Sequence, residues 1–197
     1  MKKQQLEELV LQSLEHELGG VNVYASAIEC AVRSDLKEEW QKYHQQTKSH
    51  VAALEKVCKA IGIDATRETA GRAVVRHTGQ GLIQAMKMAQ SGGDPAAAQL
   101  VACECVVLAE MKDHLDWELL TKCAKQLDGQ AAKELKAACD EIEDQEDEHL
   151  YHSKGWCREL WIESLGLQPV LPPPEEQKHV KTAIGAARAE QAADKVR

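Results

Sequence analysis

The amino-acid sequence predicts an all-α protein, and three observations support this fold class. The 197 residues include only 5 prolines, and the long segments between them are rich in Ala, Leu, Glu, Lys and Gln, which favour helices. Runs of β-branched residues, which favour strands, are absent. Apolar residues recur at three- and four-residue spacing, as on the buried face of an amphipathic helix. We therefore expect a four-helix bundle of two antiparallel hairpins with an additional connecting helix.

Turn and capping signals divide the chain into five predicted helices. The first break is short, with Ser34 or Asp35 as the expected N-cap, so the first two helices should lie antiparallel. Later signals are Gly62, the run Ser91-Gly92-Gly93-Asp94-Pro95 and the pair Asp128-Gly129. The predicted helices cover residues 4–33, 34–61, 71–90, 95–127 and 130–165.

The C-terminal part of the chain is predicted to lie outside the bundle. We expect residues 1–166 to form the helical bundle and residues 167–197 to form a proline-rich arm and a flexible tail. The arm is expected to lie against the bundle through Val170 and Leu171. From Glu175 onward the sequence is charged and alanine-rich without a sustained apolar stripe, which predicts a mobile or weakly helical segment.

The charge distribution argues against two classes of partner. The chain has 32 acidic and 24 basic residues, a formal net charge of −8, and its basic residues are interspersed with acidic ones. We therefore expect no nucleic-acid partner and no membrane partner. The sequence shows neither an apolar targeting segment nor a stretch long enough to span a bilayer, so a cytoplasmic protein is expected. The seven cysteines are odd in number and lack Cys-x-x-Cys spacing, which favours reduced thiols.

A carboxylate and an imidazole interrupt the inward stripe of the fifth predicted helix. Glu146 and His149 share one helical face with Leu135, Cys139 and Ile142. A buried carboxylate is costly unless it is paired, hydrogen-bonded or bound to a metal. Glu-x-x-His facing the middle of a bundle is also the half-site from which carboxylate-bridged dimetal centres are built.

Three other helices carry candidate ligands for the same centre. Glu17 on the first helix and His50 on the second fall where apolar residues are expected. A lone histidine on an apolar face is more often a core residue with its hydrogen bonds satisfied. Because Glu17 and Glu146 are expected in the same layer, we predict that His50 is a metal ligand. On the fourth helix, Glu110 and His114 can point at one site. Its inward face is less clearly defined, and Glu104 is the alternative carboxylate if the helix is rotated.

With these residues, the chain over about residues 6–165 resembles the ferritin-like di-iron carboxylate superfamily, including uncharacterised bacterial ferritin-like proteins. The family places one Glu on each of two helices and Glu-x-x-His on each of the other two, around two metals. Glu17 and Glu110 match the single carboxylates, and Glu146 with His149 matches one full motif. The resemblance implies iron as cofactor, with two ions, and a reaction with O₂ or peroxide.

One position departs from the family pattern. The second helix reads Thr47-Lys48-Ser49-His50 where the family has Glu-x-x-His, so a bridging carboxylate is missing and only His50 carries over. Either His114 or Glu143 can replace the lost ligand, or the site holds a single ion. Oxygen and imidazole donors without thiolate suit iron, manganese or zinc.

Tyr24 and His152 are expected next to the ligands. Tyr24 lies seven residues after Glu17 on the same face and is similar to the tyrosine that accompanies this ligand in ferritins and bacterioferritins. It is expected to donate a hydrogen bond to a carboxylate or to act as a one-electron relay; the alternative is an ordinary interface tyrosine. His152, one turn from His149, is a candidate for support of the ligands.

Three functions remain compatible with the sequence. The first is an iron-dependent oxidoreductase that consumes O₂ or peroxide and handles iron or oxidative stress. The second is a metal-binding or storage protein without turnover. The third is a structural bundle with a buried polar network, although no inward Arg or Lys is predicted to pair the carboxylates. Gly19-Gly20 within the first helix predicts close approach of another helix, and a homodimer through this region or the outer faces is a further hypothesis.

Overall fold

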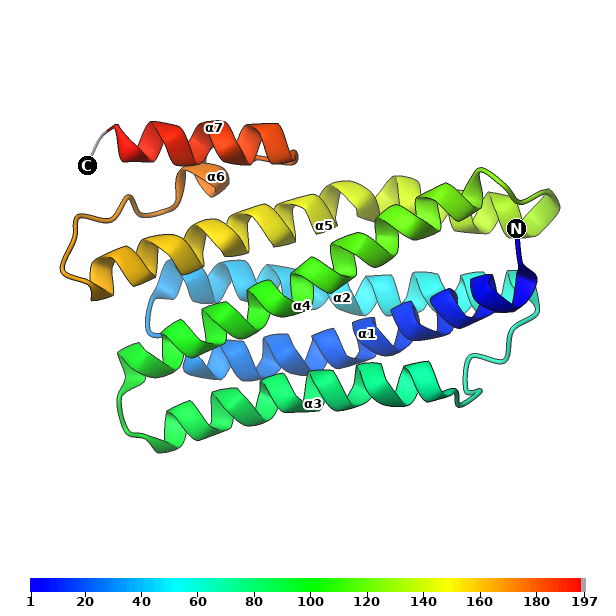
Figure 1. The fold of residues 1–197 in the computed structure, drawn as a ribbon, viewed down its shortest axis with the longest axis horizontal. Helices are drawn as coiled ribbons and strands as arrows, with labels where there is room; N and C mark the ends of the chain where they lie inside the picture. Colours follow the sequence, from blue (N-terminus) through cyan, green and yellow to red (C-terminus); the bar gives the residue numbers. More distant parts are fainter. Residues whose placement is uncertain (196–197) are drawn as a thin grey trace.

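All regular elements within residues 1–195 are α-helices (Figure 1). The structure is a computed structural model that describes residues 1–195, and no strand occurs in that range. This confirms the all-α prediction. The helices are α1 (Lys3–Cys30), α2 (Ser34–Ile61), α3 (Ala70–Ser91), α4 (Pro95–Ala124), α5 (Gly129–Ser164), α6 (Pro174–Gln177) and α7 (Ala183–Asp194).

The helix ends follow the local signals, with small differences. Gly62 ends α2 with φ of 81°, a left-handed conformation that glycine adopts without strain. Asp94 caps α4 by accepting hydrogen bonds from the amides of Ala96 and Ala97. The N-cap of α2 is Arg33, whose side chain pairs with Asp35, so the predicted capping by Ser34 or Asp35 was wrong.

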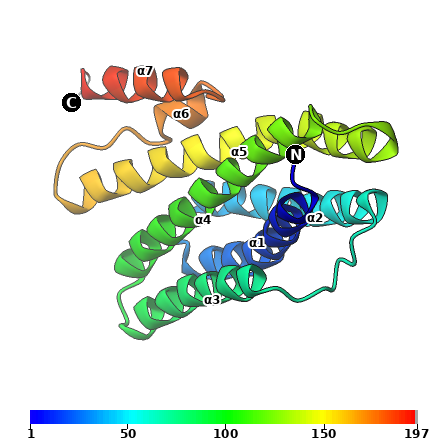
Figure 2. The same ribbon diagram turned by 45° about the vertical axis from the view of Figure 1, so that its right-hand side comes forward.

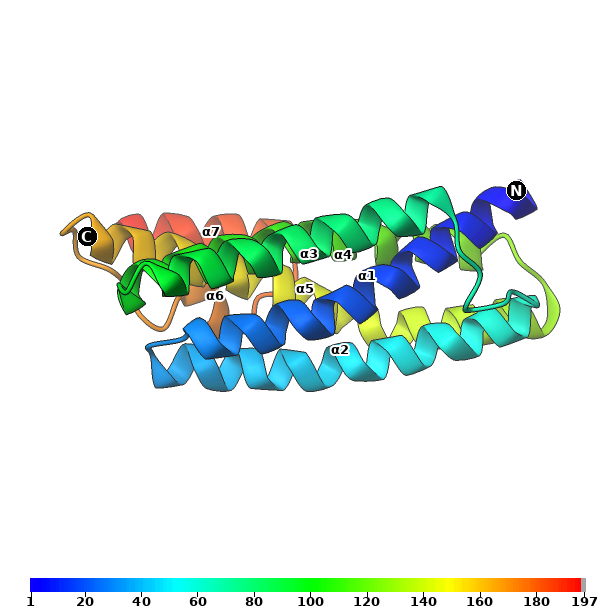
Figure 3. The same cartoon turned by 90° about the horizontal axis from the view of Figure 1, so that it is seen from below.

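Four long helices surround the core in two antiparallel pairs, α1 with α2 and α4 with α5. Helix α1 also packs against α4, and α2 against α5, so the four helices form a closed ring of neighbours (Figure 2). Helix α3 runs in the same direction as α1 and packs against both α1 and α4 (Figure 3). It thereby carries the chain from the far end of α2 to the start of α4.

The core consists of two apolar clusters, which lie toward opposite ends of the four long helices. Tyr24, Trp40 and Trp156 belong to one cluster, and Leu54 and Trp117 belong to the other. Each long helix contributes to both clusters and carries buried polar residues between its two contributions. A polar layer therefore crosses the middle of the core, and apolar packing on both sides fixes the helices that supply it.

The two glycines of α1 lie where other helices approach. A Cβ atom on Gly20 would lie 3.2 Å from Cγ2 of Thr47 on α2, and one on Gly79 of α3 would lie 3.9 Å from Cα of Gly19. The predicted close approach is confirmed. Helices of the same chain explain both glycines, without a second copy.

We expect Gly20→Ala to destabilise the protein by roughly 1 kcal/mol. Thr47 is 3% exposed, and its hydroxyl donates to the Tyr43 carbonyl, so it has little room to move away from a new methyl group. Gly19→Ala is the matched control, because a Cβ there meets no atom within 4 Å and Ala favours the helix by about 1 kcal/mol. Urea unfolding that showed equal stabilisation by both substitutions would contradict the packing argument.

The C-terminal arm packs on α5. The amide of Val170 donates to Glu159, Leu171 packs against the apolar cluster of Tyr24, and Glu175 is 2% exposed. Residues 183–194 then form α7, which contacts α5 and α6. The tail is thus helical over residues 183–194, as one of the two predicted alternatives has it. Thr182 caps α7 by accepting from the Gly185 amide, and burial of its alanines stabilises it despite the lack of larger apolar residues.

Within residues 1–195, no helix combines the length and apolar character that crossing a membrane requires. The seven cysteines are all free thiols, as the sequence predicts.

Candidate metal centre

Five predicted ligands meet in the polar layer of the core. They come from all four long helices, and none is more than 3% exposed. The five are Glu17 on α1, His50 on α2, Glu110 on α4, and Glu146 and His149 on α5.

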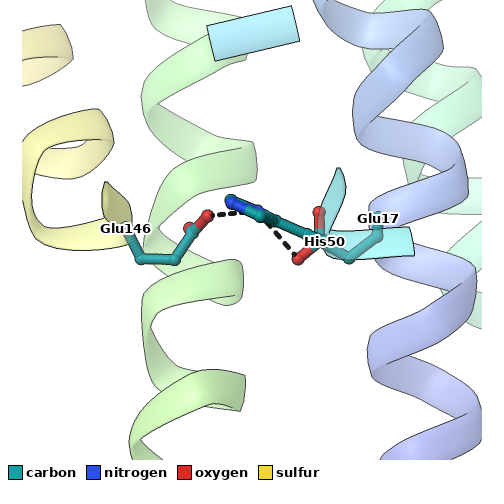
Figure 4. A group of neighbouring side chains, drawn as sticks. All are labelled: Glu17, His50 and Glu146. Carbon is teal, nitrogen blue, oxygen red and sulfur yellow. Dashed lines mark ion pairs between the residues drawn. The ribbon is translucent and has the colours of Figure 1, made fainter. Parts of the chain in front are cut away.

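The first group of ligands joins three helices. His50 lies between Glu17 and Glu146 (Figure 4). Its Nδ1 atom is 3.4 Å from Oε1 of Glu17 and 2.9 Å from Oε1 of Glu146. One ligand atom from each of the three residues lies within 4.8 Å of the others, so a single cation can contact all three.

The second group uses the same central carboxylate. Nδ1 of His149 is 3.3 Å from Oε1 of Glu146 and 3.5 Å from Oε2 of Glu110. These three residues also place one ligand atom each within 4.8 Å of the others. Glu146 therefore belongs to both groups, and its Oε1 atom faces both histidines.

Two glutamines orient the histidines. Nε2 of His50 is 3.1 Å from Oε1 of Gln145, and Nε2 of His149 is 3.1 Å from Oε1 of Gln46. An amide oxygen only accepts hydrogen bonds, so each Nε2 carries the proton. In the neutral imidazole the lone pair is then on Nδ1, which faces the carboxylates. Such a lone pair requires a proton or a metal ion between it and the carboxylate.

The buried polar atoms of the layer are incompletely hydrogen-bonded. Buried polar atoms normally have partners, so this concentration in one layer requires a cation or protons to satisfy it. The residues therefore fit a metal by the chemistry of their donors. The atoms without a hydrogen-bond partner include Glu17 Oε2, His50 Nδ1, Glu110 Oε2, both Glu146 oxygens and His149 Nδ1.

Two aromatic side chains donate hydrogen bonds to Glu17 and Glu110, the carboxylates that each belong to one group only. The indole Nε1 of Trp117 donates to Oε1 of Glu17 at 2.8 Å, and the hydroxyl of Tyr24 donates to Oε1 of Glu110 at 2.7 Å. Each carboxylate thus has one oxygen fixed by a neutral donor and the other free to bind a cation. Burial raises the pKa of the Tyr24 hydroxyl well above its ordinary value, and the charge of Glu110 and the hydrogen bond to Glu110 act in the same direction. The phenol therefore stays protonated.

The pKa values of the ligands reflect burial opposed by ion pairing. Burial disfavours the imidazolium of His50, but Glu146 and Glu17 outweigh it and raise the pKa to about 11; Glu146 and Glu110 likewise raise the pKa of His149 to about 9. Burial raises the pKa of Glu17 to about 7. The two imidazoles hold the pKa of Glu146 below its ordinary range despite burial. In the metal-free protein, protons on the histidines therefore occupy the positions that metal ions would take.

Sequence reasoning missed Asp113 and the two glutamines. Asp113 is 5% exposed, and burial together with Glu146 and Glu17 raises its pKa well above the ordinary value, which makes it a neutral carboxyl in the metal-free core. Its spacing of three residues from Glu110 and four from Trp117 was a usable signal. Gln46 and Gln145 sit at the edge of the layer, where a polar residue is unremarkable.

Helix α4 is rotated relative to the predicted face. His114 belongs to neither ligand group, and its Nε2 lies 2.8 Å from Oδ1 of Asp147 near the surface. The predicted inward position of His114 was therefore wrong; Asp113 takes it. The inward carboxylate is Glu110, while the alternative, Glu104, accepts from Trp161 at an exposed position. Because α4 contacts α1, α3 and α5, its buried face is too wide for periodicity to fix.

The lost carboxylate of α2 has no replacement in the two ligand groups. The Thr47 hydroxyl donates to its own helix, and its methyl group faces Gly20. Glu143 is exposed and also belongs to neither group. His152 lies one turn beyond His149, where Nδ1 is 3.0 Å from the hydroxyl of Tyr43, whose ring packs on His149 at 4.1 Å. His152 thus contacts the centre only through Tyr43.

Comparison with protein-family models, curated proteins and solved structures finds no match to this chain. The assignment of the site therefore rests on its geometry and chemistry.

Proposed function

We propose that the chain is a ferritin-like metal-binding protein whose core holds two metal ions bridged by Glu146. The observation that carries this proposal is the membership of Glu146 in both three-residue groups, with both of its oxygens buried and without hydrogen-bond partners. One ion would bind Glu17, His50 and Glu146. The other would bind Glu110, His149 and Glu146.

The helix arrangement supports a ferritin-like bundle. Such bundles have two antiparallel hairpins and one long crossover, with ligands that project inward from facing helices. Here α3 provides the crossover, and the ligands lie at the middle of α1, α2, α4 and α5. The single departure is Thr47, which leaves one bridging carboxylate in place of two.

The donor set favours iron and allows manganese or zinc. Five carboxylate and imidazole residues supply hard and borderline ligands, and no thiol belongs to either group. Bound iron would supply one-electron redox chemistry toward O₂ or peroxide, which suits the handling of iron or oxidative stress. Tyr24 fixes Glu110 beside the second ion and is the nearest candidate for a one-electron relay.

Metal stoichiometry tests this proposal. Tag-free protein would be reconstituted with Fe(II) without oxygen, freed of excess metal and analysed for iron. We expect two irons per chain, followed by oxygen consumption on exposure to air. One iron per chain would contradict the shared bridge, and failure to bind iron, manganese or zinc would refute the metal centre.

A buried polar network without metal is the second candidate. The raised pKa values of His50 and His149 favour it, because two imidazolium ions between three carboxylates can neutralise most of the charge. The hydrogen bonds from Tyr24 and Trp117 also occur without metal.

The pH dependence of stability separates the two candidates. The pKa of His149 is about 9 in the folded protein and 6.5 ordinarily, so its stabilisation is present below pH 6.5 and lost as the pH rises toward 9. The pKa of His50 is about 11 in the folded protein, so His50 loses a similar amount over this range, and the free energy of unfolding of the metal-free protein should fall by roughly 3 kcal/mol for each of the two histidines. The free energy of unfolding of the metal-loaded protein should fall less over this range. A metal binds unprotonated Nδ1 atoms and therefore binds more tightly as the pH rises.

Urea unfolding with and without Mn(II), at pH values from 6.5 to 9, measures both profiles. Identical profiles would support the polar network and contradict the metal centre.

A further inference from the structure

A cavity of about 220 Å³ lies between α4 and α5, and Glu146 of the candidate centre is one of its lining residues. Its inner residues are Glu146 and Trp117, and its walls include Glu118, Glu143 and Asp147. Glu146 is 1% exposed, and neither of its carboxylate oxygens has a hydrogen-bond partner. The cavity is therefore lined by the residue that belongs to both ligand groups, whose buried carboxylate pairs with His50 and His149.

The walls of this cavity are strongly acidic. Glu118, Glu143 and Asp147 provide three carboxylates, and His114 pairs with Asp147 at 2.8 Å. A narrow cleft lined by one sign of charge focuses the electrostatic potential and raises the local concentration of the opposite ion. Here the concentrated species is a cation.

The outer side of the cavity is covered by the C-terminal segment. Lys181 and Thr182, which precede α7, line it. Nζ of Lys181 lies 3.2 Å from Oδ2 of Asp144 and 3.3 Å from Oε1 of Glu148, both on α5. These ion pairs hold a positive charge over an otherwise acidic opening.

We propose that this cavity is the access passage by which a divalent cation reaches Glu146, and that Lys181 holds the C-terminal segment over its mouth. The proposal rests on the metal centre proposed above and adds its loading route. In this arrangement Glu118 and Glu143 attract the hydrated ion, His114 and Asp147 line its way inward, and Lys181 slows its passage.

Another cavity has a different character. It measures about 360 Å³ between α1, α3 and α4, and its lining consists mostly of Gly, Val and Leu residues with Lys112 and His16 among them. None of the five candidate ligands lines it. Its chemistry does not favour a cation, and it does not open onto a ligand.

The rate of metal loading tests the passage. Stopped-flow tryptophan fluorescence would follow Fe(II) uptake without oxygen, with Trp117 next to Glu17 as the reporter. We expect the double variant Glu118→Gln/Glu143→Gln to load roughly tenfold more slowly than the unmodified protein at low salt, with the final iron content unchanged. The matched control is Glu55→Gln/Glu141→Gln, which removes the same charge from exposed positions outside the cavity and should load at the unmodified rate.

A second variant tests the role of Lys181 at the mouth of the cavity. Lys181→Ala removes the positive charge and both ion pairs, so loading should become several-fold faster, whereas Lys178→Ala on the same segment should change nothing. An unchanged or slower rate in Lys181→Ala would refute its role.

The outcomes distinguish the passage from the centre. If the unmodified protein takes up iron but Glu118→Gln/Glu143→Gln loads at the same rate, the passage is refuted and the centre stands. A lower final iron content in that variant would make these residues ligands and refute the passage. If the unmodified protein takes up no iron, both proposals fail.

Discussion

Glu146→Gln should remove both metal ions from the protein rather than one. The Glu146 carboxylate is shared between the group of His50 and the group of His149, so its replacement by a neutral amide weakens both sites. We expect metal affinity to fall by more than the roughly 100-fold that loss of an outer hydrogen-bond partner costs. The measurement is iron per chain after anaerobic reconstitution, with circular dichroism to show that helical content is retained.

Single-group variants provide the comparison for Glu146→Gln. Glu17→Gln should lose the ion at His50, and Glu110→Gln should lose the ion at His149, leaving one iron per chain in each case. Glu141→Gln, on an exposed position of the same helix as Glu146, should keep two. One iron retained in Glu146→Gln would show that the two groups do not share this carboxylate.

Arg72→Ala should destabilise the protein by roughly 1.5–3 kcal/mol, the range for loss of hydrogen bonds to a charged group, because Arg76 still pairs with Glu15. Arg72 is 4% exposed at the start of α3, and its Nε and Nη2 atoms donate to Oε2 of Glu15 on α1 at 3.0 and 2.7 Å. Its Nη1 atom also donates to the carbonyls of Ala65 and Arg67. Removing the guanidinium leaves a carboxylate that is 7% exposed with one fewer partner and leaves two carbonyls unbonded.

Arg76→Ala is the matched control for Arg72→Ala. Arg76 also contacts Glu15, but its side chain is 38% exposed, so solvent screens the pair and its loss should destabilise the protein much less than loss of Arg72. Urea unfolding of both variants measures the difference. Equal effects would mean that burial of Arg72 adds nothing to its pairing with Glu15. Iron content should stay at two per chain in both variants, because Glu15 faces α3 rather than the centre.

Local sequence patterns predict the helices and most of the polar layer. A helical period places Glu17, His50, Glu146 and His149 on stripes that are otherwise apolar, and only one face of each helix is apolar enough to be buried. Strong local signals, such as the Asp94 cap and Gly62, fixed most helix ends. These features depend on neighbours within about one helical turn, so they can be predicted without knowledge of the fold.

The grouping of the ligands depends on how the helices pack, which the local patterns do not show. The sharing of Glu146, and the orientation of His50 and His149 by Gln145 and Gln46, depend on which residues of separate helices lie opposite each other. The choice of Asp113 over His114 required the rotation of α4, because three neighbouring helices widen its buried face. The folding of α7 onto α5 and α6 likewise depends on contacts that a weak local pattern cannot reveal. The contacts that group the ligands join residues about 100 positions apart in the sequence, as Trp117 and Glu17 are. Helical periodicity carries no information about contacts at that separation.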